Sequence, residues 1–481
     1  MADALKIGWA QTDLSPDGPV LIAGQFHARV SEGVMDPLTA TALAMEGPQD
    51  HAVLVSCDLV GVSDELRDAV RARLAGRTDG LDPMKVVLNA THTHTGPEVR
   101  TPRPDAGHVS RELCVELPVM RPGDYVEFAA DRIADAAGQA WASRKSGTIA
   151  FGVGQAVVGR NRRVVELDGT STMYGNTDAP SFSHVEGYED HSVNVLATHD
   201  GRAELTGLVV NVPCPSQVSE NEFVLSADYW HEVRLELRRR LGDKLFVLPQ
   251  CSAAGDQAPY PPFDKRAAER MLALSGRTRR REIAHRIVGA VEEVLQVLDG
   301  RTDPAAPLRH HVETLELATN ALTEDDVREA AREAENWQAQ YEQERRKLEA
   351  DPRLRDQPRW YVPITRAYRR MLWFRGVAER FQRRRDNPCL PAELHVIRLG
   401  EMAFATNPFE YYLDFGVYIK ARSKAVQTFL VQLAGAGTYV PTGRSVAGGG
   451  YGSIPASNPV GPEGGRQLAD RTIEVIRQFW A

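Results

Sequence analysis

The strongest constraint on the fold is an alternation of short apolar runs with longer stretches of helical spacing. The apolar runs are bounded by turn residues and are rich in β-branched side chains, which is typical of buried strands, and they cover residues 51–61, 84–90, 205–212 and 244–250. The stretches of helical spacing cover residues 64–74, 125–143 and 228–241. This alternation predicts a layered α/β architecture in preference to an all-β fold.

Residues 322–388 have a different character. Thr323 followed by Asp326 is a helix-capping signal, and apolar residues then recur at helical intervals through a highly charged stretch. A segment with three prolines, residues 351–363, separates this stretch from a second, arginine-rich one. The pattern predicts a helical hairpin inserted into a single domain of residues 1–481. We expect its apolar stripe to pack on the body of the domain or to join subunits of a homo-oligomer, with a substrate lid as the alternative.

Charge and cysteine usage restrict the partners and the compartment. The chain has 57 Lys and Arg against 65 Asp and Glu, and the net charge of −8 repels nucleic acid and anionic lipid at long range. A small-molecule substrate is therefore expected, with no nucleic acid and no membrane as partner. The five cysteines are dispersed without a CxxC pair, and the sequence opens without a basic, apolar leader. Both features predict a cytoplasmic protein.

The segment NATHTHTGPEVR, residues 89–100, carries the most informative polar side chains. It follows a predicted strand and places His92 and His94 two residues apart. In extended backbone, alternate side chains project to one face, so both imidazoles can point into one cavity. Two neutral imidazoles suit a divalent metal, zinc first, whereas a hydrogen-bonded pair of histidines in a turn is the equally weighted alternative.

A series of motifs in fixed order extends over most of the chain. They are GWAQTDLSP, GVMDPLTATALAM, SCDLVG, NATHTHTGP, GRNRR, SADYW, AAGDQAP, NPFEYYLDFG, IKARS and GTYVPTGRSVAGGGYG. In this order they resemble the N-terminal catalytic domain of the neutral/alkaline non-lysosomal ceramidases and their bacterial relatives. The resemblance implies a layered, mixed-sheet α/β catalytic domain of ceramidase type, and only the predicted helical insertion stands outside it.

The resemblance also implies a zinc site and the residues around it. His92, Glu410 and Tyr439 match three of the four zinc ligands of the family. His94 matches a substrate-facing catalytic imidazole, and Tyr451 matches a tyrosine that contacts the reacting group. Arg162 matches the family's site arginine, although Arg160 and Arg163 beside it leave the register open. Apart from the resemblance, Glu410 is interpreted as an exposed acid that caps the following helix.

Two departures from the family pattern change the expected chemistry. Where relatives have the second zinc histidine, this chain has Pro215, and we expect His231 to replace it, in preference to Cys214, because the first turn of a helix beside the strand ends can reach the same cavity. Where relatives have a serine with an assigned catalytic role, this chain has Ala258, which excludes a serine acyl-enzyme at that position. Ser252 nearby is interpreted as a buried structural residue.

Together these features predict a zinc-dependent hydrolase that cleaves a linear amide, or a related acyl or lactone bond, by metal-activated water. Ceramide is not the expected substrate, because its hydrolysis demands a long apolar channel and access to a membrane. A small polar substrate is expected instead, with Arg160 and Asn176 binding its hydroxyl or carboxylate groups, although solvated loops explain these two residues equally well. The alternatives are a metal-dependent carbohydrate-active enzyme, either glycosidase or lyase, and a non-catalytic ligand-binding relative.

Overall fold

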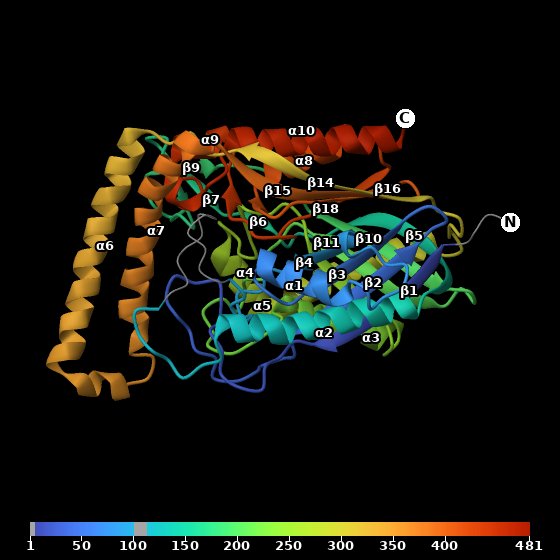
Figure 1. Cartoon of the computed structure of the whole chain (residues 1–481), viewed down its shortest axis with the longest axis horizontal. Helices are drawn as coiled ribbons and strands as arrows, with labels where there is room; N and C mark the ends of the chain where they lie inside the picture. The colour runs from blue at the N-terminus through green and yellow to red at the C-terminus, as the bar shows by residue number, and fades with distance from the viewer. Residues whose placement is uncertain (1–4, 101–112) are drawn as a thin grey trace.

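The computed structural model describes residues 5–100 and 113–481, and in this part of the chain the elements form four layers, helix, sheet, sheet and helix (Figure 1). The larger sheet has eight strands in the order β12-β11-β10-β5-β1-β2-β3-β4 within the described residues. Their bounds are β1 Lys6–Asp13, β2 Thr39–Glu46, β3 His51–Cys57, β4 Val86–Ala90, β5 Lys145–Gln155, β10 Ser192–Asp200, β11 Leu205–Val212 and β12 Phe246–Cys251. All four strands predicted from apolar runs belong to this sheet.

Parallel and antiparallel pairs both occur, so the predicted mixed-sheet α/β fold is confirmed. β3 pairs with β4 in parallel and β11 pairs with β12 in parallel, whereas β1, β2, β5 and β10 pair antiparallel with their neighbours. Helix α1 (Asp64–Leu74) connects β3 to β4, and α3 (Tyr229–Leu241) connects β11 to β12. Such helical crossovers are needed because parallel strands cannot be joined by a tight turn.

Four helices cover the outer face of the large sheet. They are α1 and α2 (Pro122–Ala142) over β1 to β4, and α3 and α5 (Arg279–Leu298) over β5 and β10 to β12 (Figure 1). The buried residues of α2 include Ala129, Ile133, Ala136 and Ala140, at the spacing of one helix face, and the three small alanines let the helix lie close to the strands.

The second sheet packs against the inner face of the first. Its order is β14-β15-β16-β18, with bounds Leu308–Ala318, Cys389–Leu399, Met402–Thr406 and Gln427–Val431. Phe404 and Phe429 of this sheet belong to the same buried cluster as Leu43 and Val209 of the larger one. Helices α8 (Leu413–Arg422) and α10 (Pro462–Phe479) cover its outer face and complete the fourth layer (Figure 1).

The helices expected in residues 322–388 are α6 (Glu324–Ala350) and α7 (Tyr361–Asp386), and they project from one end of the molecule (Figure 1). They lie between β14 and β15, which are antiparallel partners along their full length. Thr323 and Asp326 form the predicted capping box. The side chains of α7 that pack inward include Trp373, Phe374 and Val377. A subunit contact through these helices remains a prediction. Among the described residues no helix is both long enough and apolar enough to cross a bilayer.

A buried chain of ionisable side chains ties the second sheet to α1. Arg71 of α1 binds both carboxylate oxygens of Glu393 at 2.8 Å. Glu393 also contacts His395 at 2.7 Å, and His395 contacts His310 of the neighbouring strand at 2.9 Å. Burial opposes ionisation of Glu393, but the hydrogen bonds and charges of His395 and Arg71 outweigh it, so the pKa of Glu393 lies below its ordinary value.

Glu393→Gln should therefore destabilise the fold by about 3 kcal/mol at pH 7, because it leaves the charge of Arg71 buried without a partner. A carboxylate with a depressed pKa contributes stability above its unfolded pKa of about 4.3 and loses it as the pH falls further. The difference between wild type and variant, measured by urea unfolding, should thus shrink below about pH 4. Glu344→Gln, which removes the exposed pair with Lys347, should change stability by no more than about 0.5 kcal/mol.

Candidate active site

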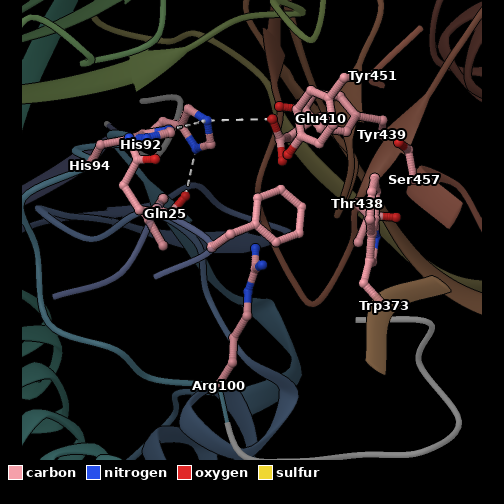
Figure 2. Close-up of a pocket in the computed structure, with 13 residues that line it drawn as sticks. Gln25, His92, His94, Arg100, Trp373, Glu410, Thr438, Tyr439, Tyr451 and Ser457 are labelled. Atoms are coloured by element: carbon pink, nitrogen blue, oxygen red, sulfur yellow. Dashed lines mark hydrogen bonds and ion pairs between the residues drawn. The ribbon is translucent and has the colours of Figure 1, made fainter. Parts of the chain in front are cut away.

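A cavity of about 80 Å³ is lined in part by Trp373 of α7, one of the two helices of the insertion. Loops of the large sheet, loops of the second sheet and helix α7 all contribute to its wall (Figure 2). Its lining residues are Gly24, Gln25, Phe26, Val60, His92, His94, Arg100, Trp373, Glu410, Thr438, Tyr439, Tyr451 and Ser457. Five residues predicted for the site, from sequence positions 92 to 451, are therefore brought together.

The two histidines lie on the loop that leaves the carboxyl end of β4. The backbone of His92 has φ 64°, in the left-handed region, which a non-glycine residue seldom occupies outside constrained sites. Backbone hydrogen bonds from Thr93 to Leu59 and from His94 to Ser216 hold the loop in this form. The two Nε2 atoms are 3.3 Å apart, so the predicted convergence of the imidazoles is present, although the backbone is not extended.

The neighbouring loop fits closely around His94. A Cβ on Gly24, whose φ is +93°, would lie 2.7 Å from Nδ1 of His94, so this position requires glycine for both conformation and space. Arg29, which is fully buried, donates to the carbonyl of His94 at 2.5 Å and to the carbonyls of Glu220 and Glu222. The backbone of His94 is thus fixed from two sides.

Glu410 and Tyr439 are placed side by side by a short parallel pair. Strands β17 (Glu410–Tyr411) and β19 (Tyr439–Val440) put the two residues in direct register. The side chain of Glu410 is 12% exposed and does not cap α8, which has no side-chain cap. Burial opposes its ionisation, but the neighbouring His92, the charge of Arg162 and a hydrogen bond from Tyr439 prevail, so the pKa of Glu410 is lowered.

The donors and acceptors around His92 fit a bound cation. Nδ1 of His92 lies 2.6 Å from the carbonyl oxygen of Val60, which can only accept, so Nδ1 carries the proton and the lone pair of the neutral ring is on Nε2. Nε2 faces a carboxylate oxygen of Glu410 at 3.5 Å. A charge-assisted hydrogen bond is usually about 2.7–2.9 Å, whereas two tetrahedral zinc ligands at about 2.1 Å from the metal are about 3.4 Å apart. The spacing therefore suits a zinc ion better than a shared proton.

The ligands available for such an ion are His92, Glu410 and Tyr439. Within residues 5–100 and 113–481 no three His, Cys, Asp and Glu side chains form a metal-binding group by themselves, so the phenol of Tyr439 is needed. His231 does not line the cavity; it lies in the first turn of α3, and the charged groups that act on it include Asp36 and Arg280. Cys214 is buried outside the cavity, where burial raises the pKa of its thiol. The structure brings neither proposed replacement to the cavity.

Of the three arginines in the GRNRR segment, Arg162 contacts a residue that lines the cavity, although it does not line the cavity itself. Arg162 is 4% exposed and donates to the hydroxyl groups of Tyr174 at 2.7 Å and Tyr439 at 3.2 Å. Arg160 points elsewhere and pairs with Glu189 at 2.9 Å. Asn176, the other predicted substrate-binding residue, accepts a hydrogen bond from the backbone of Asp178 within its own turn. Neither Arg160 nor Asn176 lines the cavity.

Two solved structures share this arrangement of layers. The neutral ceramidase from Pseudomonas aeruginosa superposes with a TM-score of 0.67 at 17% identity, over 100% of this chain and 75% of that one. A ceramidase complexed with C2 superposes with a TM-score of 0.66 at 16% identity, over 99% of this chain and 75% of that one. The chain has the fold of the neutral ceramidases. No protein-family model matches the sequence, and no curated protein matches it either.

One buried residue beside the site, Gln217, was not predicted from the sequence. Gln217 follows β11, two residues after Pro215, and is 2% exposed. Its amide nitrogen lies 2.8 Å from Nε2 of His94, and its amide oxygen accepts from Arg162 at 3.1 Å. The only signal in the sequence was its position in the loop from which the family histidine is missing.

The insertion contributes an aromatic side chain to the wall of the cavity. Trp373 of α7 contacts Phe26 and Tyr451, with ring centres 4.9 and 5.8 Å apart. The guanidinium of Arg370 lies 3.7 Å from the centre of the Phe26 ring, a cation–π contact on the other side of the cluster. Trp373 and Phe26 were not predicted as site residues, because a helical apolar stripe does not show which of its members meets a distant loop.

Arg163 fixes the glycine-rich loop that carries Tyr451. Its fully buried side chain pairs with Glu186 at 2.8 Å and donates to the carbonyls of Ser445, Gly449 and Tyr451. This loop includes Gly450, where φ is +81° and a Cβ would lie 2.3 Å from a backbone oxygen of Ser171. Arg163 is therefore a support for the site and lies outside the cavity wall.

Arg163→Ala should loosen residues 443–453 without removing the other side of the site. We expect faster amide hydrogen exchange in this loop and a loss of about 3 kcal/mol of stability, because Glu186 stays buried without its partner. Arg160→Ala, which removes the partly exposed pair with Glu189, should leave exchange in the loop at the wild-type rate. Equal exchange in wild type and Arg163→Ala would contradict the supporting role.

Proposed function

We propose that this protein is a zinc-dependent hydrolase that cleaves a linear amide, or a related acyl or lactone bond, of a small substrate. The observation that carries the proposal is the pair of acceptors, Nε2 of His92 and the carboxylate of Glu410, that face each other at 3.5 Å beside Tyr439. A zinc ion held by these three side chains would polarise a carbonyl group and lower the pKa of water towards about 7. The fold shared with the ceramidases supports the same class of reaction.

The remaining polar side chains suit the handling of charge and protons. Arg162 donates to the Tyr439 oxygen and is held in place by Tyr174, so its positive charge is fixed beside the reacting groups. Tyr451 presents its phenol to the cavity from the opposite loop. His94 is the candidate for proton transfer, because it lines the cavity and its Nε2 lies 3.3 Å from Nε2 of His92.

The walls of the cavity favour a short acyl group. Trp373 and Phe26 close the space beside Tyr451, and both rings are held by their mutual contact and by Arg370. A substrate entering here would meet apolar rings on one side and the polar groups of His94, Glu410 and Tyr439 on the other, with Arg162 behind the Tyr439 hydroxyl. This arrangement supports a small N-acyl compound as the substrate.

Metal content and product mass test the proposal together. The purified protein should contain about one zinc per chain by elemental analysis, and it should hydrolyse members of a panel of N-acyl compounds and lactones with a mass gain of one water. His92→Ala and Glu410→Gln should each lose the metal and at least about 100-fold in turnover. His231→Ala, at a residue that does not line the cavity, should keep both.

Full metal retention in both His92→Ala and Glu410→Gln would refute the ligand set. A zinc-loaded protein that cleaves no amide or lactone but cleaves a glycoside, or gives a product without added water, would favour the carbohydrate-active alternative. A protein with neither metal nor turnover would favour the ligand-binding alternative.

Removing the indole of Trp373 should change which acyl groups are accepted. In Trp373→Ala, kcat/KM for an N-hexanoyl substrate should rise relative to the N-acetyl substrate by at least about tenfold, since a methylene in an apolar pocket contributes about 1–3 kcal/mol. Trp360→Ala removes a tryptophan of the same insertion that does not line the cavity, and it should leave the ratio unchanged. An unchanged ratio in Trp373→Ala would show that another wall limits the chain length.

A further inference from the structure

Arg100 brings a permanent positive charge to the wall of the cavity. Among the described residues that line the cavity it is the one Lys or Arg side chain, and Figure 2 shows its guanidinium directed toward the other labelled side chains. The side chain is partly exposed. A guanidinium stays charged at neutral pH and has five N–H donors in a rigid fork that matches the two oxygens of a carboxylate.

The loop that follows β3 places this charge close to His92. The carbonyl oxygen of Val60 lies 2.6 Å from Nδ1 of His92, and a Cβ on the next residue, Gly61, would lie 2.9 Å from Nη2 of Arg100. Consecutive residues of a chain are about 3.8 Å apart. A small ligand whose amide faces His92 would therefore have Arg100 within reach of a group next to that amide.

The surroundings of the cavity carry an excess of positive charge, although the net charge of the whole chain is −8. Besides Arg100, arginines that contact lining residues include Arg29, Arg162 and Arg370. The acids at the described wall are Glu410, which lines it, and Glu220, which lies 3.7 Å from His94. Under the proposed function the metal takes up the charge of Glu410. Positive charge concentrated in a concave site attracts anions from solution.

We propose that the substrate of this site carries a carboxylate that Arg100 binds, and that its class is the N-acyl amino acids. Such a compound has its carboxylate on the carbon next to the amide nitrogen, so one small molecule can present its amide to His92 and Glu410 and its carboxylate to Arg100. Arg100 is then a specificity-determining residue. The inference rests on the proposed function for the amide, but the carboxylate contact can be measured without turnover.

Levulinate provides the binding test, because it is N-acetylglycine with a methylene in place of the N–H and cannot be hydrolysed. In calorimetric titrations the purified protein should bind levulinate at least about tenfold more tightly than the neutral levulinamide, because a hydrogen bond between charged groups is stronger than one to a neutral group. Arg100→Gln should abolish this preference. Arg100→Lys, which keeps the charge but loses the fork, should retain part of it.

Turnover tests the same contact with a cleavable pair. N-acetylglycine and N-acetylglycinamide both release acetate, and the wild type should prefer the acid. Arg100→Gln should lower kcat/KM for the acid by at least about tenfold, mainly through KM, because the carboxylate is bound alike in the ground state and the transition state. The value for the neutral amide should stay within about twofold, which also establishes that the variant is folded.

Arg160→Gln is the matched control, because Arg160 pairs with Glu189 and does not line the cavity. It should leave both preferences at their wild-type values. Equal binding of levulinate and levulinamide to the wild type, or an unchanged preference in Arg100→Gln, would overturn the inference even if amides are cleaved. A preference for levulinate that depends on Arg100, in a protein that cleaves no N-acyl compound, would support the carboxylate site and refute the proposed function.

Discussion

The candidate site depends on the carboxyl ends of strands from two different sheets opening into one cavity. His92 follows β4 and Gln217 follows β11 of the larger sheet, whereas Glu410 follows β16 and Tyr439 follows β18 of the smaller one. Each of these strands has a parallel partner. The carboxyl ends of the two partners, and the loops that follow them, therefore lie at the same edge of the sheet. The facing acceptors of His92 and Glu410 therefore exist only when the two sheets are packed. The polar site therefore depends on the apolar layer that packs the two sheets together.

Much of this arrangement can be predicted from sequence because it follows from local pattern. The apolar runs gave the strands of the large sheet, and the helical spacing of residues 64–74 matches the bounds of α1. Thr323 and Asp326 predicted the start of α6 to the residue. The ordered motifs, which carry long-range information that no single spacing contains, predicted that His92, Glu410 and Tyr439 meet. The correct predictions therefore rested either on a local sequence pattern or on several motifs considered together.

The failures concern positions that depend on one backbone angle or one helix rotation. His92 and His94 converge through a left-handed residue, whereas an extended segment was expected. His231 lies in the first turn of α3 as predicted, but it does not line the cavity, and the charged groups that act on it include Asp36. Gln217 was missed because glutamine has no motif of its own. Its importance arises from facing a donor, Arg162, and a ring nitrogen of His94 at once, and this is visible only when all three are placed.

The insertion shows how a peripheral element can alter a site without supplying any reactive group. Its two helices leave the antiparallel ladder of β14 and β15 intact, because both strands continue their pairing up to the point where the chain departs. The helices therefore remove no strand pairing from the sheet. Helix α7 places Trp373 in contact with Phe26 and Tyr451. An aromatic cluster of this kind is rigid, since each ring is confined by the others and by Arg370. Under the proposed function, the polar centre would keep one chemistry while a helix outside the two sheets would limit the size of the substrate.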